Sequence, residues 1–333
     1  MSRLVVVSNR VADPRHSAAT GGLAVGVRGA LEKGGGIWFG WNGEITAEEP
    51  FGPRVYTRHG VTYATLGLHA KPFEAYYNGF CNNTLWPLFH YRVGFLEYDR
   101  AQFEAYVAIN EFFARHLVPL LQRDDLIWVH DFHLIPLGAR LRQAGVDQRA
   151  GFFLHTPFPS FEVLRALPVY EQLVKDLCAY DVVGFQTERD LCAFREAVSQ
   201  PEIGADVRAP SSVRYRGRSI SLKVFPIGVD VASCAELASR HGGSHQLRRI
   251  ETSLQERLLL IGVDRLDYSK GLLKRFRAYE RLLDLHPENR RKVVFMQVAP
   301  PTRSGVLVYT EIRNDLERAA GHINRKFAEV DWV

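Results

Sequence analysis

The sequence predicts an α/β protein made of two Rossmann-like domains, each built on a doubly wound parallel sheet. A chain of 333 residues exceeds one ordinary domain, and 46% apolar with 24% charged residues is a globular composition. Short β-branched runs alternate with segments of helical length in two separate series, the pattern of strands and crossover helices in parallel sheets. We expect the two domains to face each other across a cleft.

The first series of alternating elements makes up the predicted N-terminal domain, residues 1–228. The expected strands are Leu4–Ser8, Ile127–His130, Gly151–His155, Asp181–Phe185 and Leu222–Pro226. The expected helices are Leu23–Lys33, Leu134–Ala144, Tyr170–Ala179 and Glu188–Ser199. Because helices separate the strands, the strands are expected to run parallel.

The second series follows residues 229–249, which contain Gly242, Gly243 and Ser244 and are interpreted as a linker or hinge. The expected strands are Leu258–Val263 and Lys292–Val298, and the expected helices are Leu272–Leu285 and Tyr309–Ala320. These elements form the predicted C-terminal domain, residues 250–333.

Charge and cysteine content argue against several classes of protein. The net charge is +5, from 42 Lys and Arg against 37 Asp and Glu, and both signs are interleaved along the chain, which argues against a nucleic-acid partner. The four cysteines show no metal-type spacing, and His130 and His133 are interpreted as packing and capping residues, not as half of a metal site. No apolar run approaches the ~20 residues that span a bilayer, so we expect a soluble cytoplasmic protein without a membrane partner.

Polar residues recur directly after the predicted strands, where open parallel sheets bind ligands. Arg10, Asp131, His155, Arg265 and Arg303 all follow strands. For Arg10 a fixed anionic ligand is favoured over a surface salt bridge. Asp131 could instead cap the next helix, and His155 could instead satisfy a backbone carbonyl; their shared location favours function.

The segment RLDYSKG, residues 265–271, lies between a predicted strand and a predicted helix. Arg265 can clamp a phosphate with two hydrogen bonds and Lys270 can add a mobile charge beside the helix N-terminus, so the pair suits a diphosphate. A solvated basic face is the alternative, and it fits Lys274, Arg275 and Arg277 better. Gly21 and Gly22 could offer backbone amides to a phosphate, with a plain turn as an equal alternative.

Aromatic residues with polar groups gather in the segment YYNGFCNNTLWPLFHYR, residues 76–92. Tyr76, Tyr77, Trp86 and Tyr91 could stack on the faces of a sugar and bond to its edges. For Tyr76 and Tyr91, packing in the core is the favoured interpretation.

Taken together, the motifs resemble the trehalose-6-phosphate synthases. The matching segments, in order, are VVVSNR, GGLAVG, WFGWNG, YYNGF, WVHDFHL, GFFLHTPFPS, GFQTE and RLDYSKG, from Met1 almost to the last residue. The resemblance implies a retaining glycosyltransferase of the GT-B fold, a hexosyltransferase that moves glucose from UDP-glucose to glucose 6-phosphate. The products would be α,α-trehalose 6-phosphate and UDP.

The resemblance also implies roles for individual residues. Gly21, Gly22, His155, Arg265 and Lys270 would bind UDP-glucose, and Arg10, Tyr77, Trp86, Asp131 and Arg303 would bind glucose 6-phosphate. The residues next to the chemistry would be Arg265, Lys270, His155 and Asp131, the last as an acceptor-binding group and not as a base. No cofactor and no metal are expected, and the sequence leaves a homo-oligomer open.

Two departures from the family pattern concern the acceptor pocket and the end of the chain. Thr156 stands where the family often has an aliphatic residue. A segment resembling Asp-Gly-Met-Asn-Leu-Val-Ala-Lys-Glu-Tyr does not occur before Val333, so the chain is interpreted as C-terminally truncated, with an incomplete second domain and an uncovered apolar sheet face. The truncated chain is expected to be inactive and prone to aggregate. The alternatives are a related synthase with another donor nucleotide or with glycerol 3-phosphate as acceptor, and a non-catalytic regulatory paralogue.

Overall fold

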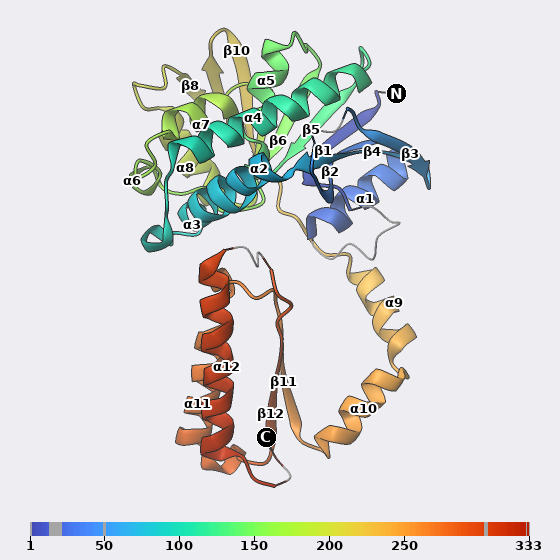
Figure 1. The fold of residues 1–333 in the computed structure, drawn as a ribbon, viewed down its shortest axis with the longest axis vertical. Helices are drawn as coiled ribbons and strands as arrows, with labels where there is room; N and C mark the ends of the chain where they lie inside the picture. Colours follow the sequence, from blue (N-terminus) through green and yellow to red (C-terminus); the bar gives the residue numbers. More distant parts are fainter. Residues whose placement is uncertain (1, 13–21, 49–50, 303–305, 331, 333) are drawn as a thin grey trace. The chain divides into compact units, whose positions relative to one another are not determined.

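The structure, a computed structural model, describes residues 2–12, 22–48, 51–302, 306–330 and 332 (Figure 1). Its internal contacts divide the chain into two compact units, Met1–Gly228 and Val229–Val333. Gly21 and Arg303, two of the predicted site residues, lie outside the described residues.

The first unit is built on a ten-stranded sheet with the order β3-β4-β2-β1-β5-β6-β7-β10-β9-β8 (Figure 1). The parallel strands are β1 (Leu4–Arg10), β2 (Gly36–Thr46), β4 (Val61–His69), β5 (Leu126–His130), β6 (Arg149–Phe153), β7 (Val182–Phe185) and β10 (Arg218–Val224). The strands at the edges, β3 (Arg54–Arg58), β8 (Asp206–Ala209) and β9 (Ser212–Tyr215), are antiparallel to their neighbours.

The predicted parallel sheet is confirmed, and antiparallel strands that were not predicted extend it at both edges. Two tight turns cause the difference, because His59–Gly60 and Arg216–Gly217 place two consecutive residues at positive φ. Two-residue turns with this backbone connect antiparallel strands directly, without a crossover helix.

The helices of the first unit lie on both faces of its sheet. They are α1 (Gly22–Gly34), α2 (Ala70–Phe73), α3 (Trp86–Phe89), α4 (Arg100–Leu117), α5 (Leu137–Gln143), α6 (Phe161–Leu164), α7 (Tyr170–Leu177) and α8 (Glu188–Val198). A π-helical segment, Glu74–Leu85, joins α2 to α3. The chain passes from β1 to β2 in one direction and from β5 to β6 and β7 in the other, so right-handed crossovers place α1 on the face opposite α5 and α7.

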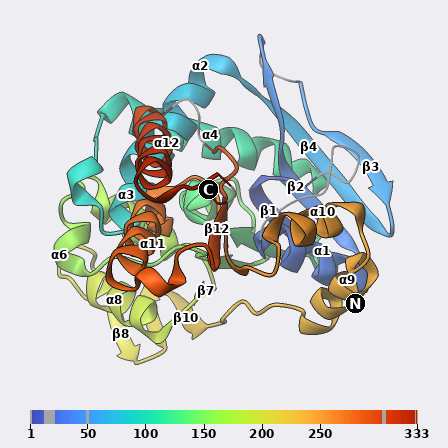
Figure 2. The same ribbon diagram turned by 90° about the horizontal axis from the view of Figure 1, so that it is seen from below.

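The second unit has a parallel pair of strands, β11 (Leu258–Val263) and β12 (Val293–Val298). Helices α11 (Leu272–Leu285) and α12 (Leu307–Phe327) lie side by side (Figure 1 and Figure 2). They bury Leu283, Ile323 and Phe327 together with Trp332. The predicted linker 229–249 contains α9 (Val231–His241) and the start of α10 (His245–Leu254), and its role as a hinge stays a prediction.

The apolar residues of β11 remain largely exposed. Leu258, Ile261 and Val263 are 69%, 59% and 65% exposed, although they belong to a parallel sheet, a structure that is normally covered on both faces. Within the described part of the chain, none of the helices is both long and apolar enough to cross a membrane.

Candidate functional site

The strand order of the first unit reverses between β1 and β5, which are direct neighbours. Ser8 of β1 is in register with His130 of β5, so Arg10 and Asp131 leave the sheet at the same edge. In open parallel sheets, ligands bind at such a reversal, outside the carboxyl ends of the strands. The topology thus places two of the predicted site residues at the edge where a ligand is expected.

Asp131 holds a backbone conformation that is unusual for any residue other than glycine, with φ 73° and ψ 165°. Its N–H donates to Phe153 O over 2.8 Å, and its Oδ1 accepts the N–H of His155 over 3.2 Å. Its side chain makes no capping hydrogen bond to the helical turn that follows, so the alternative interpretation as an N-cap is wrong. Burial raises the pKa of the Asp131 carboxyl, while His155 and the backbone N–H groups favour its charged form.

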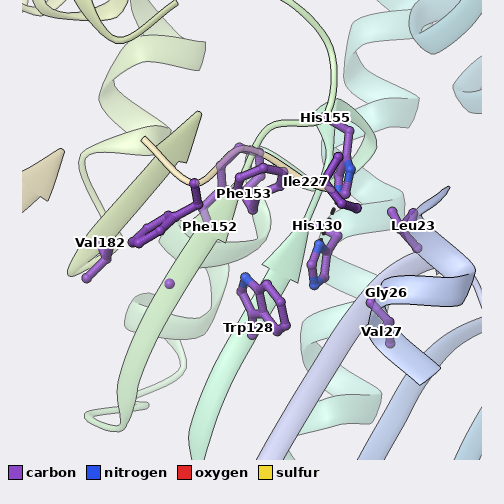
Figure 3. Close-up of a pocket in the computed structure, with 12 residues that line it drawn as sticks. Leu23, Gly26, Val27, Trp128, His130, Phe152, Phe153, His155, Val182 and Ile227 are labelled. Atoms are coloured by element: carbon purple, nitrogen blue, oxygen red, sulfur yellow. Dashed lines mark hydrogen bonds between the residues drawn. The ribbon is translucent and has the colours of Figure 1, made fainter. Parts of the chain in front are cut away.

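His155 is held by the two consecutive residues at the end of β5. Its Nε2 lies 3.0 Å from Nδ1 of His130, the contact drawn as a dashed line in Figure 3, and its backbone N–H is bound by Asp131. Burial lowers the pKa of both imidazoles. The partner of His155 Nε2 is therefore a histidine side chain and not a backbone carbonyl, the alternative that the sequence left open.

The guanidinium of Arg10 lies against the loop at the end of β2. Its Cζ is 5.5 Å from the centre of the Trp41 ring, and a Cβ on Gly43 would come within 2.8 Å of its Nη2. Gly43 has φ +96°, so its backbone favours glycine, and a Cβ there would displace the guanidinium. Among the residues that the structure describes, no carboxylate forms an ion pair with Arg10, and its role in binding an external anion stays a prediction.

Tyr77 joins the same aromatic surface. Its ring stacks on Phe73 and on His133, with centroids 5.2 Å and 5.8 Å apart, and lies 6.0 Å from Trp41. The structure thus brings Arg10 and Tyr77 to one tryptophan, next to the turn that begins with Asp131. His133 acts here as a packing residue, as predicted, and no group of three metal-ligating side chains occurs within the described ranges.

The other aromatic residues of this segment separate into core and surface. Tyr76 is fully buried, and its hydroxyl donates to Asn9 Oδ1 over 2.7 Å, so the prediction of core packing is confirmed. Tyr91 is 39% exposed, and its hydroxyl accepts the N–H of Ser160 over 2.9 Å, so the same prediction is wrong for Tyr91. Trp86 is buried against His90, with ring centroids 3.9 Å apart.

A cavity of about 490 Å³ lies beside His130 and His155 (Figure 3). Its lining is mostly apolar and comes from Leu23, Gly26, Val27, Trp128, Gly151, Phe152, Phe153, Val182, Phe225 and Ile227 in addition to the two histidines. Gly22 begins α1 next to this wall, and a Cβ on it would meet nothing within 4 Å. Among the described residues, the space beside Gly22 is therefore empty.

Arg265 and Lys270 belong to the second unit, where both are exposed at the turn between β11 and α11. Asp267 shapes this turn by accepting the N–H of Ser269 over 2.9 Å, and Gly271 follows with φ 64°. Arg275 pairs with Asp264 and donates from Nη2 to Lys270 O over 3.2 Å. The interpretation of Arg275 as a solvated basic residue is wrong, because it holds the turn in place.

Three contributors to the site were missed in the sequence. Trp41 and Gly43 lie against the guanidinium of Arg10. The local signal for them was the motif WFGWNG, which contains both residues. Asp190 accepts the N–H of Phe158 over 3.0 Å and so ties the loop after β6 to α8. Its signal was the Thr187-x-x-Asp190 capping pattern. Thr156, in that loop, buries a hydroxyl that has no partner among the described residues.

Residues 4–333 match the sequence model of glycosyltransferase family 20. The chain is 43% identical to the trehalose-6-phosphate synthase of Escherichia coli K12 over 336 residues, covering 100% of this chain and 70% of that protein.

Two solved structures are similar over nearly the whole chain. An α,α-trehalose-phosphate synthase (UDP-forming) from Burkholderia xenovorans in complex with glucose 6-phosphate has a TM-score of 0.93 and 48% identity, over 99% of this chain and 73% of that one. An E. coli structure bound with UDP-2-fluoro glucose has a TM-score of 0.91 and 42% identity, over 99% of this chain and 72% of that one.

Proposed function

This chain belongs to glycosyltransferase family 20, the family of the trehalose-6-phosphate synthases, and we propose that it transfers glucose from UDP-glucose to glucose 6-phosphate, releasing UDP. Its fold is α/β and of the GT-B type. The observation that carries the proposal is the grouping of Arg10, Tyr77 and Asp131 at the strand reversal of the first unit. The relatives support it, since one holds glucose 6-phosphate and another an analogue of UDP-glucose.

Charged and aromatic side chains bind the acceptor, glucose 6-phosphate, in this proposal. Arg10 is a cation without a carboxylate partner in the described part of the chain, and its planar guanidinium suits a phosphate. Tyr77 offers an aromatic face for the sugar, Asp131 offers carboxylate oxygens for its hydroxyl groups, and Trp86 shapes the pocket wall. Arg303 joins Arg10 on the phosphate in this proposal.

Backbone N–H groups, His155 and two cationic side chains bind the donor, UDP-glucose, in this proposal. Gly21 and Gly22 offer backbone N–H groups to a phosphate in this proposal, with Gly22 at the start of α1, and His155 binds the glucose of the donor. Arg265 and Lys270 bind the diphosphate. As the bond from the sugar carbon to the diphosphate breaks, negative charge grows on the departing oxygen, and these two cations stabilise it.

Binding of the acceptor's phosphate, away from the reacting hydroxyl, orients the acceptor. The phosphate of glucose 6-phosphate, fixed by Arg10, aligns the attacking hydroxyl with the donor carbon. The departing phosphate takes the proton of that hydroxyl, and Asp131 holds the acceptor without acting as the base. The product is then α,α-trehalose 6-phosphate with the configuration at the donor carbon retained.

The test is UDP release by the purified chain with UDP-glucose and glucose 6-phosphate. Replacing Arg10 by Ala should raise the KM for glucose 6-phosphate by ~10-fold to ~100-fold, the range expected for a lost charge-assisted contact, and leave the KM for UDP-glucose unchanged. Arg54→Ala is the matched control, because Arg54 is an exposed arginine paired with Glu44. Equal use of glucose and glucose 6-phosphate would contradict the acceptor assignment.

A panel of donors and acceptors separates the related activities. Replacing UDP-glucose by ADP-glucose or GDP-glucose should slow the release of the nucleoside diphosphate. Replacing glucose 6-phosphate by glycerol 3-phosphate should slow the release of UDP. Calorimetric binding of glucose 6-phosphate without any turnover would instead indicate a non-catalytic member of the family.

A further inference from the structure

His130 is a fully buried residue whose two ring nitrogens have different surroundings. It is 1% exposed, and its Nδ1 lies 3.0 Å from Nε2 of His155. Its Nε2 is buried and has no hydrogen-bond partner among the described residues. His130 lines the cavity described above, whose wall here comes from the apolar residues Leu23, Val27 and Trp128 (Figure 3).

The contact between the two histidines requires one proton and one lone pair. Burial lowers the pKa of both rings, so both are neutral near neutral pH and each carries a single N–H. Either His130 donates from Nδ1 to His155, or His155 donates from Nε2 to His130. The two arrangements differ in which nitrogen of His130 and of His155 is left with a proton.

The apolar cavity distinguishes between these arrangements. If His155 donated, the proton of His130 would be on Nε2, where no described residue accepts it. If His130 donates from Nδ1, its Nε2 is an unmet acceptor, and unmet acceptors are tolerated better than unmet N–H donors in protein interiors. The proton of His130 therefore belongs on Nδ1, and that of His155 on its own Nδ1.

We propose that His130 is a positioning residue that donates from Nδ1 to His155 Nε2 and thereby fixes His155 as the Nδ1–H tautomer, with a hydrogen-bond donor directed to a sugar hydroxyl oxygen. The functional part of this inference depends on the proposed role of His155 in binding the donor glucose. Asp131 holds the backbone of His155 at the same time, over 3.2 Å. Consecutive residues of one strand end thus set both the position and the tautomer of one side chain.

The wild-type chain tests the tautomer directly. With ¹⁵N-labelled histidine at about pH 8, well above the ordinary pKa of an imidazole, NMR distinguishes a protonated from an unprotonated ring nitrogen. The His155 signals are assigned by their loss in His155→Gln. A proton on Nδ1 of His155 supports the proposal, and a proton on Nε2 overturns it, whether or not the chain transfers glucose.

Two substitutions of His130 then test the donor. Asn can place an amide N–H near the position of Nδ1, so His130→Asn should keep His155 in the Nδ1–H form, whereas His130→Phe should release it to a mixture of tautomers. His116→Phe is the control for loss of an imidazole, because His116 packs on Phe112 of α4, away from this contact. An unchanged His155 tautomer in a folded His130→Phe chain would overturn the proposal.

Kinetics separate positioning from simple structural support. His130→Phe should lower kcat for the proposed reaction by ~10-fold to ~100-fold, the size expected for a displaced reacting group, with the KM for glucose 6-phosphate unchanged. His130→Asn should restore most of kcat. Equal losses in the Asn and Phe variants would overturn the donor role, while an inactive wild-type chain with the expected His155 tautomer would refute the proposed function and leave the hydrogen bond established.

Discussion

Asp131 shows that one residue at the site is kept in a conformation that costs stability. Its φ of 73° with ψ of 165° is adopted readily only by glycine, and such backbone strain costs about 1–3 kcal/mol. The strained residue is the one whose carboxylate accepts the backbone N–H of His155. The backbone, and not a helix cap, thus accounts for the position of this carboxylate.

Asp131→Gly should therefore be more stable than Asp131→Ala. Both remove the carboxylate, but only glycine relieves the strain, and we expect a difference of about 1–2 kcal/mol in the free energy of unfolding. Urea denaturation followed by circular dichroism measures it. Equal stabilities of the two variants would show that the backbone is unstrained or relaxes when the side chain is lost.

Asp176 is a buried carboxylic acid in α7, away from the proposed ligands. It is 2% exposed, Gln172 donates to its Oδ1 over 2.8 Å, and its Oδ2 has no partner among the described residues. Burial raises its pKa to about 7, although Gln172 and Arg140 favour the charged form. Above the pKa of the unfolded state, the carboxylate is ionised in the unfolded chain. Folding must then either protonate it or bury its charge, and both cost free energy.

The stability contributed by protonated Asp176 should fall as the pH rises. Because the folded pKa lies above the unfolded one, the folded state binds more protons between about pH 4 and pH 7, and the free energy of unfolding declines across that window. Asp176→Asn removes the titration. We expect the variant to gain about 2–4 kcal/mol relative to wild type between about pH 4 and pH 8. A difference between the two proteins that is independent of pH would contradict this assignment.

At the scale of elements, α8 shows how a helix start supports the site. Thr187 Oγ1 accepts the N–H of Asp190 over 3.2 Å, which caps the helix. Asp190 in turn accepts the buried N–H of Phe158 over 3.0 Å. The loop that carries His155 and Thr156 is thus attached to the first turn of α8.

Asp190→Ala should cost more than the loss of an ordinary cap. It leaves the buried N–H of Phe158 without an acceptor, at about 1–3 kcal/mol, in addition to weakening the helix start. Asp99→Ala is the comparison, because Asp99 caps α4 at an exposed site by accepting the N–H of Gln102, and we expect about 1 kcal/mol there. The measurement is the free energy of unfolding in urea, and a larger loss in Asp99→Ala would contradict the role of Asp190.

Element prediction succeeded where local periodicity was strong. Helices α1, α7, α8 and α11 and strands β1, β5, β7, β11 and β12 lie within a few residues of their predicted bounds. The prediction omitted α4, the π-helical segment and the hairpins at the sheet edges. The π-helix in particular has no sequence period of its own, since its geometry depends on packing, here mainly against α4.

At the scale of the whole molecule, the two units differ in how completely they bury their sheets. The first contains the entire ten-stranded sheet together with Arg10, Tyr77 and Asp131. The second has a two-stranded sheet with exposed Leu258, Ile261 and Val263. A two-stranded sheet is at best marginally stable without further packing.

Residues 1–228 expressed alone should unfold cooperatively in urea, whereas residues 229–333 alone should not. The second fragment should also bind a hydrophobic dye through the exposed face of β11. Tryptophan fluorescence and dye binding measure both outcomes. A sharp cooperative transition of the 229–333 fragment would show that α11 and α12 supply enough core by themselves.

The sequence by itself determined the α/β class, most of the parallel strands with their helices, and the polar residues that follow the strands, because these depend on local periodicity and on motif chemistry. Only the tertiary structure decided that β1 neighbours β5, that Arg10 and Tyr77 meet at Trp41, and that His130 contacts His155. The physical reason is that an alternating pattern specifies which face of a strand is buried, whereas the order of the strands follows from contacts between residues far apart in the chain.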